Sequence, residues 1–282
     1  MKLVTCDNLQ GRNSTLLTSL PYYYFCGVFH GYCFQMGIEK LAFVTGAGSG
    51  LGRATCLALA REKAVIVAAD ANIKTAKETV NLITKESKQN HLAVEVQVES
   101  SKSVREALAQ VLQNYITPPS VIVNSAGILR DNFLTKLSEE DFDEVLAINL
   151  KGTFLVTQIF ANAIIEHQIK NGSIINIGSI VGKYGNLGQA NYTASKAGVE
   201  LLSKTASQEL GKFGIRVNTI LPGMIWTPML QSVPEKVREK FVKMIPLERF
   251  GKPEEVAEVI AFLASDKSSY VNGSSITITG GF

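Results

Sequence analysis

The chain is poor in the residues that metal centres and disulfide frameworks require. It has four cysteines and three histidines among 282 residues, and Cys6, Cys26 and Cys33 all precede the region of regular predicted structure. A disulfide-stabilised fold would distribute its cysteines along the whole chain, so we expect a reducing compartment. The histidines are not grouped as zinc ligands are, and no metal site is predicted.

Excess charge and long apolar runs are also scarce. The net charge of +3 is small for this length, and no long basic run is present, so no nucleic-acid partner is predicted. No continuous apolar stretch of about 18 residues is present, so no membrane span is predicted. With 46% hydrophobic and 19% charged residues, the chain can form one large domain with a substantial core.

Residues 1–38 differ in composition from the rest of the chain. Asp7 is their only acidic residue, and Tyr22, Tyr23, Tyr24 and Phe25 form an aromatic cluster. An acid-poor, Ser-rich segment is typical of mitochondrial targeting, although the scarcity of arginine is not. Because Met36 stands just before the first predicted strand, a mis-assigned start codon is the second possibility. A structured, functional segment is the third. We expect an extension at 1–38 before a domain at 39–282, in the mitochondrial matrix or otherwise in the cytoplasm.

From position 41 onward, short β-branched runs alternate with amphipathic stretches. The runs are almost continuously apolar, which is typical of strands buried on both faces of a parallel sheet. Such alternation predicts the α/β class, with a single Rossmann-like, doubly wound parallel sheet of about seven strands flanked by helices. The strands are predicted at 41–45, 64–70, 92–98, 120–124, 173–178, 215–220 and 275–279.

Two helix starts carry recognisable signals. Ser138 with Asp141 three residues later has the spacing of a capping box and opens a long predicted helix. Pro253, followed by two glutamates, is typical of a first helical turn.

A glycine-rich turn, TGAGSGLG, follows the first predicted strand at 45–52. Glycines there let the backbone approach a pyrophosphate, and the N-terminus of the next helix supplies free N–H groups and a partial positive charge. This position at the first strand–helix turn predicts dinucleotide binding by Gly46, Ser49, Gly50, Leu51 and Gly52.

The second predicted strand ends at Asp70, where an acid commonly binds the adenosine ribose hydroxyls. The alternative is a solubilising acid at a strand end. A carboxylate there would repel a 2′-phosphate by roughly 1–4 kcal/mol at contact distance. Ala71, also expected at the cofactor, and the two residues after it supply no basic side chain, so NAD(H) is predicted rather than NADP(H). Small residues after the fourth strand would also let the cofactor lie against the backbone at Asn124, Ala126 and Gly127.

Ser179, Tyr192 and Lys196 are the candidate catalytic residues. Tyr192 and Lys196 are four positions apart and share a helix face. Carbonyl reduction needs a proton donor opposite the hydride, and a tyrosine hydroxyl has a pKa of about 10, too high for efficient work near neutrality. We expect Lys196 to lower the pKa of Tyr192, and Ser179 to hold the carbonyl oxygen. Tyr192 and Lys196 are also expected to contact the cofactor.

Together these features resemble the short-chain dehydrogenase/reductase family over 41–282. The matching motifs are TGAGSGLG, NSAG, the asparagine of AINLKG, GSIVG, YTASK and LPGMIWTP. The resemblance implies that Asn149 completes a catalytic tetrad by holding a water that links Lys196 to solvent; the alternative is an ordinary hydrogen bond inside a helix. It also implies that Ile225 and Thr227 bind the nicotinamide carboxamide.

The third predicted strand departs from the family pattern. Members usually have Asp before Val at its end, whereas this chain has Gln97 before Val98. The amide oxygen of Gln97 can still accept a hydrogen bond from the adenine amino group, so both residues remain candidate cofactor contacts.

Within the family, the stretches KGTFLVTQ, GSIINIGSIVGKYGNLGQANYTASKAGV and ITITGGF resemble 17-beta-hydroxysteroid dehydrogenases and 3-oxoacyl-[acyl-carrier-protein] reductases. This resemblance implies an NAD(H)-dependent enzyme that interconverts a 3-oxoacyl thioester, of acyl-carrier protein or CoA, and its (3R)-hydroxyacyl form. The alternatives are a steroid (estradiol) dehydrogenase and a non-catalytic dinucleotide-binding scaffold subunit.

The expected assembly is a homotetramer, or a heterotetramer with a related reductase subunit, because the predicted long helices at 138–168 and 189–211 resemble the family's tetramer-forming pair. Bacterial relatives present arginines to the carrier protein on these helices, where this chain has Asn162 and Gln208. A partner subunit or a CoA thioester is therefore favoured over carrier docking at these positions.

The segment after Thr227 is predicted to form a lid over the substrate. Its apolar residues recur at near-helical spacing, and four basic residues fall mostly on the other side, where they suit a ligand that carries phosphates. The alternative is an ordinary solvated helix face. The apolar set is Pro228, Met229, Leu230, Val233, Val237, Phe241 and Met244, and the basic set is Lys236, Arg238, Lys240 and Lys243.

Overall fold

The computed structural model describes residues 40–87, 89–231, 233 and 235–282. The predicted extension at 1–38, with its aromatic cluster and three of the four cysteines, lies outside the described residues. The fourth cysteine, Cys56, is a free and buried thiol.

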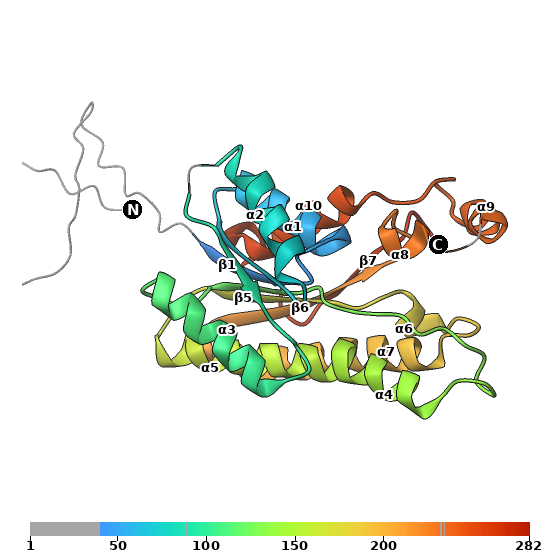
Figure 1. The fold of residues 1–282 in the computed structure, drawn as a ribbon, viewed down its shortest axis with the longest axis horizontal. Helices are drawn as coiled ribbons and strands as arrows, with labels where there is room; N and C mark the ends of the chain where they lie inside the picture. Colours follow the sequence, from blue (N-terminus) through green and yellow to red (C-terminus); the bar gives the residue numbers. More distant parts are fainter. Residues whose placement is uncertain (1–39, 88, 232, 234) are drawn as a thin grey trace, which may run out of the picture. The chain divides into compact units, whose positions relative to one another are not determined.

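Seven parallel strands form one sheet in the order β3-β2-β1-β4-β5-β6-β7, which confirms the predicted fold class (Figure 1). The chain winds outward in one direction from β1 to β3 and in the other from β4 to β7. In such sheets ligands bind at the carboxyl ends of the strands where the order reverses, here between β1 and β4. The strands are β1 (Leu41–Thr45), β2 (Val65–Asp70), β3 (Leu92–Glu95), β4 (Val121–Asn124), β5 (Gly172–Ile177), β6 (Ile215–Pro222) and β7 (Ser275–Ile278).

The third strand is shorter than predicted. Its last pair with β2 joins Asp70 to Glu95, where β2 ends. The predicted continuation at 96–98 leaves the sheet at the carboxyl edge, after one more hydrogen bond from the Val96 N–H to the carbonyl oxygen of Asp70 at 3.0 Å. Gln97 and Val98 then line a cleft, and Val98 also packs in the core.

Helices cover both faces of the sheet (Figure 1): α1, α2 and α10 pack on one face, and α3, α5 and α7 pack on the other. The short helices α6, α8 and α9 lie with the loops at the carboxyl edge. The helices are α1 (Gly50–Arg61), α2 (Ile73–Thr84), α3 (Ser101–Asn114), α4 (Glu139–Leu146), α5 (Thr153–Glu166), α6 (Val181–Tyr184), α7 (Ala190–Leu210), α8 (Pro228–Gln231), α9 (Glu235–Met244) and α10 (Pro253–Ala264).

The alternation of side chains along each strand divides the core into two layers. In β1, Phe43 packs in the layer under α3, α5 and α7, while Ala42 and Val44 pack in the layer under α1 and α10. All three residues are fully buried. Burial on both faces explains why the strands are continuously apolar in sequence.

The long helix predicted from Ser138 is confirmed. The Ser138 hydroxyl accepts a hydrogen bond from the backbone N–H of Asp141 at 3.1 Å, and α4 continues through a π-helical stretch, Ala147–Gly152, into α5. By length and composition, the combined helix Glu139–Glu166 is the one described helix that would be able to cross a membrane. However, 61% of its most apolar window is buried inside the domain, which is the arrangement of a core helix.

Candidate active site

The turn between β1 and α1 is closed by glycines that no other residue can replace without a shift. Gly46 has a φ of +65°, and a Cβ on it would lie 2.9 Å from Cα of Ala126. A Cβ on Gly52 would lie 2.1 Å from the carbonyl oxygen of Gly46. The first turn of α1 therefore packs directly on the strand end, and its free N–H groups lie at the cleft, as an anion site requires.

Thr45 joins the ends of the two central strands. Its hydroxyl oxygen accepts hydrogen bonds from the backbone N–H groups of Ser125 and Ala126, both at 3.1 Å. These bonds hold the loop after β4 against the glycine turn, which defines the floor of the cleft. Sequence reasoning did not single out Thr45, because only the tertiary pairing of β1 with β4 gives its hydroxyl a role.

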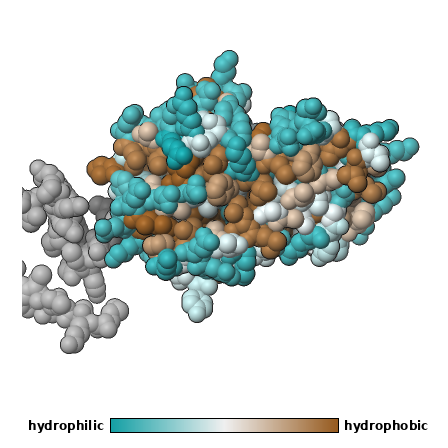
Figure 2. Space-filling view, turned by 90° about the horizontal axis from the view of Figure 1, so that it is seen from below, coloured by the Kyte–Doolittle hydropathy of each residue, from teal (hydrophilic) through white to brown (hydrophobic). Residues whose placement is uncertain are grey.

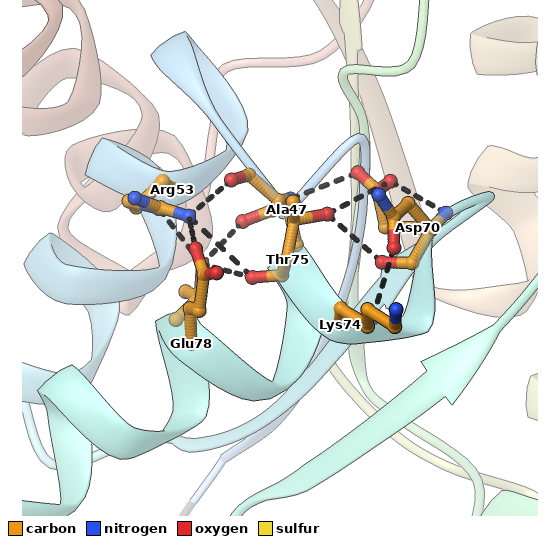
Figure 3. Close-up of polar contacts among 9 residues, drawn as sticks. Ala47, Arg53, Asp70, Lys74, Thr75 and Glu78 are labelled. Atoms are coloured by element: carbon orange, nitrogen blue, oxygen red, sulfur yellow. Dashed lines mark hydrogen bonds and ion pairs between the residues drawn. The ribbon is translucent and has the colours of Figure 1, made fainter.

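The Asp70 carboxylate is held by backbone N–H groups (Figure 3). It accepts hydrogen bonds at 2.9 Å from Gly48 of the glycine turn and from Asn72, which caps α2. A Cβ on Gly48 would lie 2.8 Å from the same carboxylate, so this turn position leaves no room for a basic side chain. An acid that served only for solubility would not need these contacts.

Arg53 is the basic side chain nearest to this turn in Figure 3, and it is already engaged. Its guanidinium donates to the carbonyl oxygen of Gly48, to Thr79 Oγ1 at 3.0 Å and to Glu78 at 3.2 Å. It therefore stabilises the turn from the side opposite to Asp70.

The strand ends and the turn enclose a cleft of about 330 Å³. Most of the predicted cofactor residues line it, namely Gly46, Ser49, Gly50, Leu51, Gly52, Asp70, Ala71, Gln97, Val98, Ala126, Gly127, Tyr192, Lys196 and Thr227. The glycine cradle, the free helix N-terminus and the fixed carboxylate fit a dinucleotide. No sequence argument had selected the apolar residues Val96, Ile128 and Ile148, which also line the cleft.

Two predicted contacts lie elsewhere. Asn124 is buried, and its side-chain amide donates to Thr157 Oγ1 at 3.1 Å and to Asn176 Oδ1 at 2.8 Å. Its side chain thus joins β4 to α5 and β5 inside the domain and does not line the cleft, so a contact with the cofactor at this position would have to come from the backbone, as predicted. Ile225 lines the adjoining cavity described below.

The three candidate catalytic side chains converge at the carboxyl edge. Ser179 follows the end of β5, while Tyr192 and Lys196 lie on one face of the first turns of α7. The side chains of Ser179 and Tyr192 both line the same cavity, and Ser179 lies close enough to the Tyr192 hydroxyl to lower its pKa. The Lys196 ammonium donates to the carbonyl oxygen of Ile177 at 2.8 Å and lies 5.6 Å from the centroid of the Tyr192 ring.

The pKa values in this group run against the sequence expectation. Burial raises the pKa of Tyr192 to about 12; the hydrogen bond with Ser179 opposes the rise and the negative charge of Asp131 adds to it. Burial lowers the pKa of Lys196 to about 8. The net shift of Tyr192 is opposite to the expected lowering, because desolvation of the buried hydroxyl is the largest influence on its pKa. Tyr192 stays protonated near neutrality, as a proton donor must.

Asn149 lies in the π-helical stretch and is fully buried. Its side chain both accepts from the backbone N–H of Ile128 at 2.8 Å and donates to the carbonyl oxygen of Ile128 at 3.1 Å. A Cβ on Gly127 would lie 3.2 Å from Asn149 Oδ1 and 3.5 Å from Lys196 Nζ. The structure thus brings Asn149 beside Lys196, across from a glycine, and π-helical turns are frequent at functional sites.

A second cavity, of about 580 Å³, adjoins the cleft at Tyr192 and Thr227. Its floor includes Ser179 and its walls are mainly apolar. The predicted lid supplies one wall through α8, α9 and the residues near them, with Met229, Leu230, Val233, Val237, Phe241 and Met244 in the lining. The predicted apolar side of this segment therefore faces the cavity. Lys240, from the predicted basic side, also reaches the cavity lining and lies at the border between the two sides.

Asp131 and Gln189 also line this cavity, and sequence reasoning missed both. Gln189 is buried and donates through its side-chain N–H to Asp131 at 2.8 Å. Burial raises the pKa of Asp131, while the Gln189 hydrogen bond lowers it. The two residues come from loops 58 positions apart, so no local pattern indicates the pair.

A doubly wound sheet with a glycine cradle and a Ser–Tyr–Lys group beside it defines a dinucleotide-dependent dehydrogenase. Over residues 46–282 the chain matches the family model described as "Enoyl-(Acyl carrier protein) reductase". Together with the relatives below, this places the chain in the short-chain dehydrogenase/reductase family of oxidoreductases.

Three similar proteins can be named. The human (3R)-3-hydroxyacyl-CoA dehydrogenase is 52% identical over 86% of this chain and 95% of its own length. The 3-oxoacyl-[acyl-carrier-protein] reductase FabG of Thermotoga maritima is 47% identical over 86% of this chain and 97% of its own length. Among solved structures, levodione reductase superposes with a TM-score of 0.81 at 32% identity, over 86% of this chain and 96% of that one.

Proposed function

We propose that the protein is an NAD(H)-dependent oxidoreductase that interconverts 3-oxoacyl thioesters and their (3R)-hydroxyacyl forms. The observation that carries the proposal is that Ser179 and Tyr192 lie together where the dinucleotide cleft meets the apolar cavity. The names of the human and Thermotoga maritima relatives support this substrate class. Two hydroxyls that meet at one point suit a carbonyl oxygen, which becomes an alcohol, better than a carbon–carbon double bond.

Each of the four candidate catalytic residues has a separate role in the proposed reaction. A bound nicotinamide would supply the hydride or accept it. Ser179 holds the substrate oxygen and Tyr192 donates the proton to it. Lys196, with a pKa of about 8, returns a proton to Tyr192 and stabilises its negative charge during the transfer. Asn149 positions the backbone of the loop after β4 through its two hydrogen bonds with Ile128.

The proposed preference for NADH rests on Asp70. Its carboxylate lines the cleft and is fixed by two backbone N–H groups. A 2′-phosphate placed against it would meet an unneutralised charge, because Arg53 is held by Glu78 and the turn carbonyl. This argument favours NAD(H) over NADP(H).

A steroid dehydrogenase is the second candidate, because the cavity is mainly apolar and large enough for a fused ring system. The basic residues of the lid favour the thioester. Lys236, Lys240 and Lys243 are exposed on α9 beside the cavity, where they can attract the phosphates of CoA or of a carrier-bound pantetheine. A neutral steroid gains nothing from these charges.

The deciding experiment is a substrate panel with NADH and NADPH, comprising acetoacetyl-CoA, a longer 3-oxoacyl-CoA, and estradiol in the oxidative direction. We expect the highest kcat/KM for a thioester with NADH. Much more efficient turnover of estradiol would favour the steroid function, and no turnover dependent on Tyr192 would favour a non-catalytic scaffold subunit.

We also propose that the protein assembles as a tetramer through the face formed by α5 and α7. Figure 2 shows apolar side chains gathered across this side of the domain. Phe154 of α5 is 40% exposed and Leu201 of α7 is 69% exposed. Large exposed apolar side chains on neighbouring helices are typical of subunit interfaces. Light scattering of wild type and of Leu201→Glu tests the assembly, and a variant that keeps the same mass would contradict it.

A further inference from the structure

One charged side chain interrupts the apolar wall of the substrate cavity close to the reacting groups. Of the described residues that line the cavity, Asp131 and Lys240 alone carry a full charge. Lys240 belongs to the lid, whereas Asp131 lies near enough to Tyr192 for its charge to act on that hydroxyl. The carboxylate is thus part of the surroundings of the reacting carbonyl, yet the proposed proton transfer does not use it.

One hydrogen bond holds the Asp131 carboxylate, and two more hold the residues around it. The buried Gln189 donates to one carboxylate oxygen at 2.8 Å, and Gln189 Oε1 in turn accepts from Asn186 at 2.9 Å. The next residue, Asn132, donates its backbone N–H to Gly188 at 2.9 Å. The loop after β4 and the loop before α7 are therefore joined, and their junction presents the carboxylate to the cavity.

No basic side chain of the described part of the chain forms an ion pair with this carboxylate. None of the ion pairs among the described residues includes Asp131, and the adjacent Arg130 pairs with Glu144 at 2.8 Å. Gln189 can offer a hydrogen bond but no charge. Asp131 is exposed at the edge of a cavity whose other walls are mainly apolar, so it contributes a negative charge there that solvent partly screens.

The field matters because of where the charge of a free 3-oxo acid would lie. One methylene separates the ketone of such an acid from its carboxylate. With the ketone oxygen at Ser179 and Tyr192, that carboxylate must lie in the same cavity as Asp131. A thioester has no charge at this point. Two like charges ~6 Å apart at an effective dielectric constant of about 20 repel each other enough to change binding roughly 10- to 100-fold.

We propose that Asp131 is a specificity-determining residue that excludes free 3-oxo and 3-hydroxy acids from the cavity and leaves it open to their uncharged thioesters. This inference rests on the proposed function for the identity of the thioester. The exclusion itself concerns charge, so it can be tested with small molecules that differ in nothing else near the ketone.

The test compares acetoacetate, methyl acetoacetate and acetoacetyl-CoA as substrates of wild type and Asp131→Asn. The asparagine keeps an oxygen that accepts from Gln189 and removes only the charge. We expect kcat/KM for acetoacetate to rise about 10-fold or more, while that for the uncharged ester changes less than about 3-fold. The ratio of acid to ester cancels any change in the acidity of Tyr192, because both substrates use the same donor.

Asp143→Asn is the matched control, since it removes the same charge from an exposed position on α4 outside the cavity lining. It should leave the acid-to-ester ratio unchanged. A ratio that stays constant in Asp131→Asn, or that moves equally in both variants, would overturn the proposal. If the ratio responds as expected but acetoacetyl-CoA is not reduced, the role of Asp131 stands and the proposed thioester function fails.

Discussion

The two halves of the active site are built differently. The cofactor cleft lies at strand ends, where the glycine turn, Thr45 and Asp70 are fixed mainly by backbone hydrogen bonds. The substrate cavity is assembled from the loop after β4, the loop before α7 and the lid helices α8 and α9. A backbone-built cleft serves one cofactor, whereas a cavity made of side chains on loops can change its substrate with few substitutions.

This difference implies a division of effects. A change in the cleft should alter cofactor choice or stability, and a change in the cavity should alter the ranking of substrates. Tyr192 lines both spaces, so loss of its hydroxyl should affect every substrate alike, while its ring still fills the cleft wall.

The largest expected effect is that of Tyr192→Phe. Loss of a general acid typically lowers the rate about 10²–10⁴-fold, and the phenyl ring still fills the junction. We expect turnover to be lost for all substrates while NADH binding stays near normal. Steady-state kinetics beside NADH fluorescence titration would measure both, and near-normal turnover would remove Tyr192 as the proton donor.

The cleft could be predicted from the sequence almost residue by residue, since its positions follow from local rules. Glycines after a first strand and an acid at the end of the second need only the strand–helix order to be located. The direction of the Asn124 side chain could not be predicted in this way, because it depends on hydrogen bonds with Thr157 and Asn176. A motif gives the path of the backbone and not which face a side chain occupies.

Only the part of the cavity wall that is formed by the lid helices could be predicted from the sequence. The periodicity of 228–244 revealed the apolar face of the lid, but nothing local joins Asp131 to Gln189. The net shift in the pKa of Tyr192 could not be predicted from the sequence for a related reason. A sequence can place a lysine four residues from a tyrosine, yet the burial that raises the pKa of Tyr192 to about 12 is a property of the whole fold.

The pH dependence should follow Lys196 rather than Tyr192. Lys196 is protonated below its pKa of about 8, and the charged form stabilises Tyr192 as it loses its proton. We therefore expect kcat/KM for reduction to fall as pH rises through about 8, by up to about 10-fold per pH unit. Lys196→Met should lose this limb, whereas Lys183→Met, an exposed lysine of α6, should retain it. A limb unchanged in Lys196→Met would assign the titration to another group.

Within the cleft, Asp70→Asn should relax cofactor choice. The amide keeps an oxygen for the N–H groups of Gly48 and Asn72, and it no longer repels a 2′-phosphate. The ratio of kcat/KM for NADH to that for NADPH should fall about 10-fold, which corresponds to about 1.4 kcal/mol. Wild-type enzyme that already prefers NADPH would contradict this placement of Asp70.

Thr45→Val tests the cleft floor through stability. The substitution leaves the N–H groups of Ser125 and Ala126 without their partner, and each unsatisfied buried donor costs about 1–3 kcal/mol. We expect the free energy of unfolding to fall by about 2 kcal/mol in urea titrations, and Thr45→Ser to stay close to wild type. Equal losses in the two variants would mean that the methyl group, and not the hydroxyl, joins the strands.

The smallest expected effect belongs to the rim of the lid. Lys236 and Lys240 are exposed on α9, so their attraction to the phosphates of a CoA thioester is screened by salt over about 10 Å at 0.1 M. kcat/KM for acetoacetyl-CoA should therefore fall by a few-fold between low salt and ~0.3 M, while methyl acetoacetate, which has no phosphates, should respond little.

Reversal of both charges in Lys236→Glu/Lys240→Glu should reduce the reaction of the CoA thioester selectively and remove its salt dependence. Lys267, exposed after α10 and outside the cavity lining, supplies the control variant Lys267→Glu. Equal loss for the thioester and the methyl ester would mean that α9 acts only by covering the cavity. The lysines of the lid would then contribute nothing to the recognition of the substrate by charge.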